Sequence, residues 1–240
     1  MAARRTTATL AGVFYLVTHV TSIAALALYS PVLNGPDYVL STGPDTQVLL
    51  GAFLEVLLAL SIVGTAVTLF PVVRRQHEGL ALGYVALRTL EAAVITVGIV
   101  SLLAVVTLRQ HLAGVAGTDT AALVIVGKAL VAVHDWTFLL GPNFVLGANT
   151  VLMAALMHRS RLVPRFIAVL GLVGGSLIFA SAIAELFGLY RQISVWGSLT
   201  AVPVFAWELA FAGWLIVRGF RPAAGAPATV ALAGPAGERA

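Results

Sequence analysis

The sequence predicts an all-α polytopic membrane protein, a bundle of six transmembrane helices arranged as three helical hairpins. Three observations support this prediction. Of the 240 residues, 60% are hydrophobic and 10% are charged, whereas soluble domains are roughly 45–50% apolar and about 25% charged. Six apolar segments are each long enough to cross a hydrocarbon core of about 30 Å as a helix. Basic residues recur at alternate ends of these segments.

The six apolar segments are separated by short stretches and leave little chain for another domain. They are Ala8–Tyr29, Gln47–Phe70, Leu80–Leu108, Trp136–Met157, Leu162–Gly188 and Val195–Val217. Transmembrane strands are about 10 residues of alternating hydrophobicity, a pattern that these segments lack. We therefore expect one six-span membrane domain over residues 1–221. The remaining residues, 222–240, form an Ala/Gly/Pro-rich tail that we expect to be disordered.

The arginines predict the orientation of the spans, because short cytoplasmic loops carry most of the Lys and Arg of membrane proteins. On one side of the spans lie Arg4, Arg5, Arg74, Arg75, Arg159, Arg161, Arg165, Arg218 and Arg221, with Arg239 in the tail. The loops on the other side hold only Arg109 and Arg191. Both termini are therefore predicted to be cytoplasmic, and the protein to lie in the inner (plasma) membrane of the cell.

The apolar run from Thr120 to Met157 is long enough to suggest two crossings. Two crossings would carry the arginines at 159–165 to the outer side, so one crossing fits the charge pattern better. Trp136–Met157 is therefore predicted to span the membrane. Residues 120–135 are predicted to form an extra helix at the outer surface, before the fourth span, with Asp119 as its N-cap.

Four ionisable side chains are predicted to meet near the middle of the membrane. At about 1.5 Å per residue, Arg88, Glu91 and Glu208 lie roughly 13–18 Å from the cytoplasmic edge, and His19 reaches a similar depth. Charges at this depth cost about 2.5–3.5 kcal/mol each on insertion scales, so they usually face partners or water. These four residues are candidate binding residues. The alternative is a buried ion-pair network that only fixes helix packing.

A second polar cluster is predicted nearer the outer surface, formed by Glu55, His134, Asp135 and Glu185. These side chains contain metal-ligating atom types, but no HExxH or equivalent spacing accompanies them. The chain also has no cysteine, which excludes disulfides, thiolate metal ligands and thiol catalysis. We therefore predict no metal, no cofactor and no catalytic residue.

The net charge of +4 does not indicate nucleic-acid binding, because the basic residues are scattered in ones and twos. The predicted partners are the lipid bilayer and a small-molecule or ion ligand. The oligomeric state is left open by the sequence.

Several motifs resemble a known family. They are Arg88-Thr89-Leu90-Glu91, the segment from His134 to Pro142, and Ser160-Arg161-Leu162-Val163-Pro164-Arg165 before a helix that contains Gly171. With the length and span count, these motifs resemble the uncharacterised prokaryotic multi-pass membrane family, domain of unknown function 4386, from about Arg4 to Arg221. The resemblance implies six helices and a membrane location, and it implies no activity.

Three functions are compatible with this pattern. The first is a small-molecule or ion transporter with a polar site in the middle of the membrane, in which an acidic residue takes up a proton. The second is a non-catalytic membrane module for assembly, sensing or lipid interaction, whose buried charges are purely structural. The third, an intramembrane hydrolase, requires a nucleophile or three converging ligands that the sequence does not display.

Overall fold

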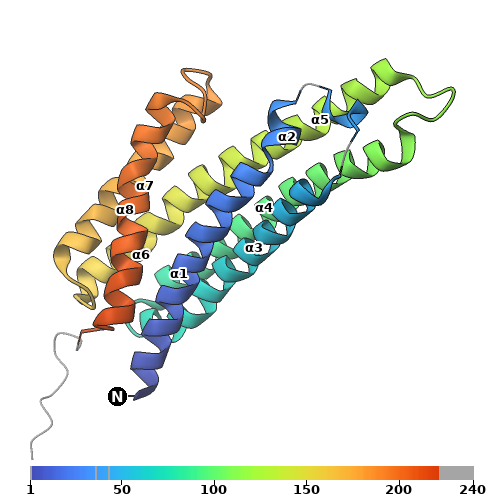
Figure 1. Cartoon of the computed structure of the whole chain (residues 1–240). Helices are drawn as coiled ribbons and strands as arrows, with labels where there is room; N and C mark the ends of the chain where they lie inside the picture. Colours follow the sequence, from blue (N-terminus) through green and yellow to red (C-terminus); the bar gives the residue numbers. More distant parts are fainter. Residues whose placement is uncertain (1, 36, 43, 222–240) are drawn as a thin grey trace, which may run out of the picture.

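The computed structural model describes residues 2–35, 37–42 and 44–221. The predicted disordered tail at 222–240 lies outside the described residues. Within them the secondary structure is helical (Figure 1). The elements are α1 (Ala2–Leu28), α2 (Ser30–Asn34), η1 (Tyr38–Leu40), α3 (Thr46–Val73), α4 (Glu78–Leu112), α5 (Thr120–Leu139), η2 (Leu140–Val145), α6 (Leu146–Ser160), α7 (Arg165–Leu186) and α8 (Val195–Val217).

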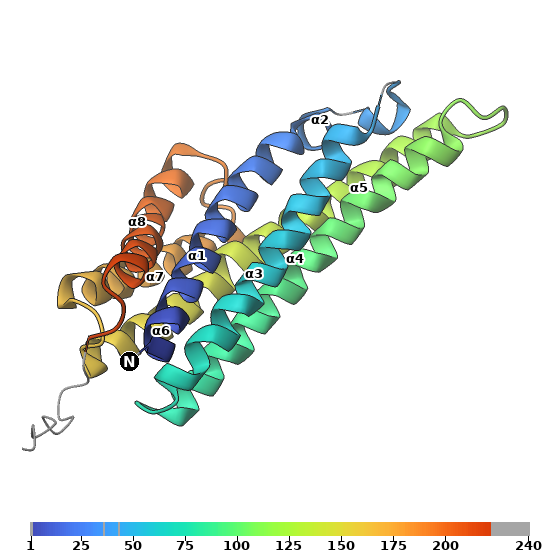
Figure 2. The same ribbon diagram turned by 60° about the horizontal axis from the view of Figure 1, so that its bottom comes forward.

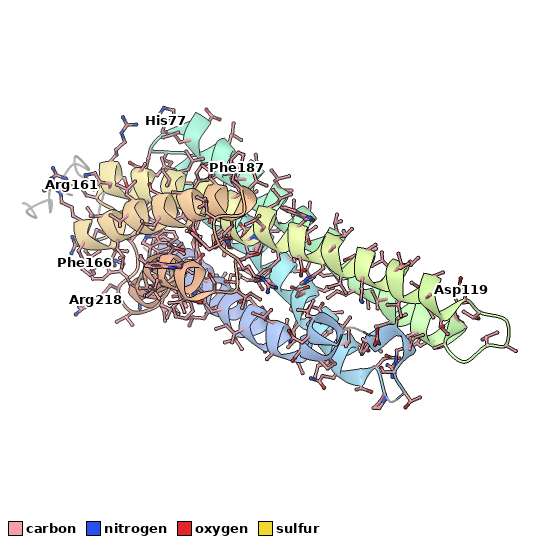
Figure 3. The ribbon with its side chains drawn as sticks, turned by 90° about the horizontal axis from the view of Figure 1, so that it is seen from above. His77, Asp119, Arg161, Phe166, Phe187 and Arg218 are labelled. Atoms are coloured by element: carbon pink, nitrogen blue, oxygen red, sulfur yellow. The ribbon has the colours of Figure 1, made fainter. Side chains whose placement is uncertain are left out.

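Six helical segments of the described chain are long and apolar enough to cross a membrane, which confirms the predicted six-span, all-α bundle. We call the end with the start of α1 and the close of α8 the terminal end, and the opposite end the far end. The α3–α4 and α6–α7 turns lie at the terminal end. Figure 3 shows Arg161 and Arg218 at this end and Asp119 at the other. Apart from Arg239, which lies outside the described residues, the arginines predicted to be cytoplasmic therefore flank the spans at one end of the bundle.

The helices form two groups that diverge toward the far end (Figures 1 and 2). One group contains α1, α3, α4 and α5, and the other contains α6, α7 and α8. The groups are joined where α1 packs on α8 and where α4 packs on α6 and η2. The buried apolar residues form two clusters: one, centred on Tyr15, Trp207 and Phe211, draws on both groups, and the second, around Ile62 and Leu102, lies in the first group.

The structure differs from the prediction in the fourth span. Helix continues from α5 through η2 into α6, so Thr120–Ser160 is one segment of 41 residues. The expected break near Asp135 is absent from this part of the described chain, because neither glycine nor proline interrupts the helix there. One crossing is retained, as predicted, but the expected outer helix is the first half of the span. At about 1.5 Å per residue the segment is roughly 60 Å long, so it must tilt in a bilayer or project from it.

The irregularity in this span lies instead at η2, a π-helical segment that contains Pro142. Proline has no N–H to donate to the carbonyl four residues earlier, so the carbonyl of Phe138 loses its helical partner. The side chain of Gln192, from the loop between α7 and α8, donates to this carbonyl at 3.1 Å. The far-end loop thus satisfies the backbone group that the proline leaves without its usual bond.

Glycines allow the helices of the second group to approach closely. A Cβ atom at Gly174 of α7 would lie 2.6 Å from the backbone nitrogen of Val204 in α8, and one at Gly171 would lie 2.4 Å from Nε1 of Trp207. Gly175 faces the other way, toward Gly147 of α6, and each of these two would bring a Cβ within 3.0 Å of the other's carbonyl oxygen. Small residues of this kind are typical of close packing between membrane helices.

Substitution of Gly174 by alanine is expected to destabilise the folded protein by about 1–3 kcal/mol, since backbone must move to accept the new methyl group. The matched control is Gly213→Ala in α8, where a Cβ would meet nothing within 4 Å. This control should be neutral or more stable, by up to about 1 kcal/mol, because alanine has the higher helix propensity. Thermal unfolding of the purified variants in detergent measures both. Equal midpoints for the two variants would contradict the close α7–α8 contact.

Candidate functional site

Arg88 of α4 is the centre of a buried ion network in the middle of the bundle. Its side chain is 2% exposed. The guanidinium donates to Tyr84 through Nε at 3.2 Å, to Glu91 through Nη1 at 3.1 Å and to Glu208 through Nη2 at 3.3 Å. Glu91 lies one turn further along α4, whereas Glu208 comes from α8. One cation is therefore shared by two carboxylates from different helices, as its burial requires.

Neighbouring helices complete the network. The amide of Asn149 in α6 donates to Oε2 of Glu91 at 2.6 Å. The guanidinium of Arg88 lies over the ring of Tyr15, 5.0 Å from its centroid, and the hydroxyls of Tyr15 and Tyr84 are 2.9 Å apart. Aromatic faces stabilise a cation electrostatically when it is removed from water. Side chains of α1, α4, α6 and α8 thus meet at a single charged centre.

His19 of α1 lies at the edge of this network and faces Glu208. Its Nδ1 is 2.9 Å from the carbonyl oxygen of Tyr15. Because a carbonyl oxygen can only accept, Nδ1 is protonated and donates a hydrogen bond to it. Its Nε2 is 3.5 Å from Oε2 of Glu208. Since a neutral imidazole with its proton on Nδ1 has only a lone pair at Nε2, attraction to the carboxylate requires a second proton. Only with that second proton would His19 and Glu208 form an ion pair.

A cavity of about 330 Å³ lies beside the network. Cavities that bind small molecules usually measure about 300–1,000 Å³. Every membrane-spanning helix contributes to the lining, which is apolar over much of its surface through residues such as Ile62, Ile95 and Phe205. The polar lining residues are Thr18, His19, Ser22, Tyr29, Glu55, Arg88, Glu91, His134, Asn143 and Glu208. The cavity occupies the angle between the two diverging helix groups, with the Arg88 network on its polar side.

The predicted outer cluster is divided in the structure. Glu55 of α3 and His134 of α5 both line the cavity, and Tyr29 contacts each of them. Its hydroxyl donates to Glu55 at 3.0 Å, and its ring packs edge-on against the imidazole of His134. Asp135 lies next to His134, 3.6 Å from Nδ1, but its side chain is 69% exposed and turned away from the interior.

Glu185 of α7 forms a separate set of hydrogen bonds. It accepts from Asn143 at 3.0 Å and from Ser181 at 2.7 Å. The hydroxyl of Ser181 is in turn 2.8 Å from those of Tyr190 and Thr200. This set joins α7, α8 and η2 at the far end, and it meets the cavity through Asn143. Among the described residues, His, Asp and Glu side chains do not form a group of three or more that could hold a metal ion.

A further polar cluster, not predicted as a site, closes the far end of the first group. Arg109 of α4 forms an ion pair with Asp45, the residue before α3, and lies over the ring of Tyr38. Asp45 also accepts hydrogen bonds from Tyr38 at 2.8 Å and from Gln110 at 2.9 Å. We call Tyr38, Asp45, Arg109 and Gln110 the far-end clasp. It attaches the α1–α3 connection to the end of α4.

Several contributors to the site were missed in the sequence. Four uncharged residues interact with the charged ones: Tyr15, Tyr29, Tyr84 and Asn149. Each lies in an apolar segment of the sequence, where neither a charge nor a motif marks it. One signal was present: Tyr84 and Arg88 are four residues apart and therefore share a helix face with Glu91. The partners from other helices had no comparable signal, because their spacing in sequence carries no information about tertiary contact.

Comparison with known proteins assigns the chain to a family. A protein-family model described as Domain of unknown function (DUF4386) matches residues 10–219. The chain belongs to this family. The match confirms the resemblance seen in the sequence, and the matched DUF4386 region contains the whole Arg88 network from His19 to Glu208. No curated protein and no solved structure matches the chain.

Because Arg88 neutralises two carboxylates, the variant Arg88→Met should lose folded protein more severely than the double variant Arg88→Met/Glu208→Gln. Removing one partner of a buried ion pair typically costs about 3–5 kcal/mol, since an unpaired charge is left inside. The double variant removes one of the two stranded carboxylates and should recover part of that loss. The fraction of monodisperse protein after detergent extraction measures the effect. Additive losses would show that the two side chains are not coupled.

Because the far-end clasp contains an ionised carboxylate, it predicts that the stability of the folded protein depends on pH. Burial alone would raise the pKa of Asp45, but hydrogen bonds from Gln110 and Tyr38 and the charge of Arg109 hold it below its ordinary value of 3.8. Burial and the bond to Asp45 raise the pKa of Tyr38 to about 12, so Tyr38 remains a donor at neutral pH. The stabilisation is therefore complete above pH 3.8 and is lost as the pH falls through the folded-state pKa of Asp45.

Asp45→Asn should remove this acid-sensitive contribution. At neutral pH it should lower the free energy of unfolding by about 1 kcal/mol, the upper range for a partly exposed ion pair. As the pH falls below 3.8 and through the lowered folded-state pKa of Asp45, the two proteins should converge in stability. Thermal midpoints across a pH series check both statements. A constant difference at every pH would count against the clasp.

Proposed function

We propose that this DUF4386 protein is a small-molecule or ion transporter of the inner (plasma) membrane, with both termini in the cytoplasm. The proposal is carried by one observation, the cavity of about 330 Å³ that borders the Arg88 network within the bundle. Charged side chains inside a membrane protein commonly mark the route of a substrate or ion. Here Arg88, Glu91, Glu208 and His19 are the binding residues.

The arrangement of the helices supports this function. The cavity is lined by residues of both helix groups, which are joined toward the terminal end and diverge toward the far end (Figures 1 and 2). Transporters commonly place their site between two halves of a bundle near the middle of the membrane, and they expose it to each side by rocking those halves. In the proposed orientation, the far end is the outer side.

A second function, a non-catalytic membrane module, is favoured by a different observation. All three nitrogens of the Arg88 guanidinium have acceptors in the protein, and Glu91 has two donors. A network satisfied in this way also serves to fix helix packing without any ligand. The two functions differ in whether the cavity is hydrated, since a structural network requires no access for water. The outer cluster gives a hydrolase no converging set of groups, and we do not propose one.

Reaction of a single introduced cysteine separates the two functions, because the chain itself contains no cysteine. Ile95→Cys places a thiol on the cavity wall, and Leu102→Cys, two turns along the same helix, places one in the packed core. A transporter predicts that a small water-soluble methanethiosulfonate modifies the thiol at 95 at least about tenfold faster than that at 102, because only a hydrated thiol reacts readily. Mass spectrometry follows the reaction in membranes. Equal, slow modification at both positions would favour the structural module and reject the transport proposal.

A further inference from the structure

The charges around the cavity are unbalanced. Glu55, Glu91 and Glu208 line it, together with a single guanidinium, that of Arg88. With all three carboxylates ionised and both histidines neutral, the wall would carry two negative charges, and the proton held between Glu208 and His19 reduces this to one. Uncompensated charge in the membrane interior is costly, so the site favours positive counter-charge, either as protons or as a cationic ligand.

Oε2 of Glu208 is one carboxylate oxygen that is placed to receive a cation. Oε1 of the same group accepts from Arg88, whereas Oε2 of Glu91 and Oε2 of Glu55 accept hydrogen bonds from Asn149 and Tyr29. Oε2 of Glu208 faces His19 at the longer distance of 3.5 Å. Any cation that occupies this position competes directly with the proton that the pair holds.

The remaining walls indicate the kind of cation. Aliphatic side chains and the rings of Phe138 and Phe205 line the cavity beyond the polar side. Bare metal ions gain nothing from such walls, whereas an organic ammonium group with an apolar body is stabilised by both the aromatic faces and the aliphatic surface. The lining therefore matches an amphipathic cation.

Two residues that line the cavity are also exposed at its α1–α8 side. Contacts between α1 and α8 include Gly12 with Ile216 at the terminal end and the rings of His19 and Phe205, 4.8 Å apart. Ile23 of α1 and Phe205 of α8 line the cavity and are 58% and 42% exposed. An entrance between α1 and α8 at these residues would admit a ligand dissolved in the bilayer.

We infer that the cavity binds a monovalent, amphipathic organic ammonium ion, with its charged group at Oε2 of Glu208, in exchange for the proton held between Glu208 and His19. This inference rests on the proposed transport function and names its substrate class. One positive charge enters and one proton leaves, so the charge of the site is unchanged. The groups that face His19 and Glu208 are Tyr15 from α1, Arg88 and Glu91 from α4, and, across the cavity, Glu55 from α3 and His134 from α5.

Benzyltrimethylammonium is a suitable probe, and neopentylbenzene is its neutral carbon isostere. Isothermal titration of the purified full chain in detergent should show saturable binding of the cation, with an affinity at least tenfold above that of the isostere. Titrations in buffers of different ionisation enthalpy should show close to one proton released per cation. Where the proton is bound, affinity should rise about tenfold per pH unit.

Glu208→Gln should reduce the affinity for benzyltrimethylammonium at least tenfold and abolish proton release. The matched control is Glu78→Gln, at the exposed start of α4, which should leave both unchanged. If Glu208→Gln does not fold, the unmodified protein still tests the inference. The two measurements are then the affinity for the cation relative to its isostere and the number of protons released per cation bound. Equal binding of cation and isostere, or binding without proton release, would overturn the inference.

Failure of this inference is distinguishable from failure of the transport proposal. If Ile95→Cys is modified rapidly but benzyltrimethylammonium does not bind, the cavity is hydrated and takes a different substrate. If Ile95→Cys is as unreactive as Leu102→Cys, the cavity is dry and both proposals fail.

Discussion

The structure depends on neutralising one guanidinium inside an apolar bundle. Arg88 is buried, so carboxylates must approach it, and the helices that carry them are fixed in position as a result. Glu91 lies on the same helix, so its contact with Arg88 does not constrain the position of any other helix. Glu208 must come from α8, which belongs to the other helix group, and this contact therefore sets how the two groups meet.

Two buried apolar clusters lie on either side of this charged layer. The cluster around Tyr15 and Trp207 draws on both helix groups toward the terminal end, whereas the cluster around Ile62 and Leu102 belongs to the first group alone. Apolar packing is nondirectional and would allow many registers of one helix against another. The hydrogen bonds of the charged layer select one of them. The cavity lies where these clusters separate, so its polar and apolar walls follow from the same division.

Much of this architecture could be predicted from the sequence, because a bilayer imposes simple rules. Span lengths and the distribution of arginine were sufficient for six helices in three hairpins. Depth along each span placed Arg88, Glu91, Glu208 and His19 in one layer, and the structure brings all four into contact. Depth carries no information about direction around a helix axis, however. For that reason Glu55 and Glu185, predicted together, face different partners, and Asp135 points outward.

The continuous helix from α5 to α6 has a mechanical consequence. Its two halves belong to different helix groups, so any pivoting of one group against the other would have to be absorbed along it. The π-helical turn at Pro142 is where the regular helix is interrupted, and irregular turns of this kind are common sites of bending. The hydrogen bond from Gln192 to Phe138 lies at this turn, so bending there would act directly on a contact made by the α7–α8 loop.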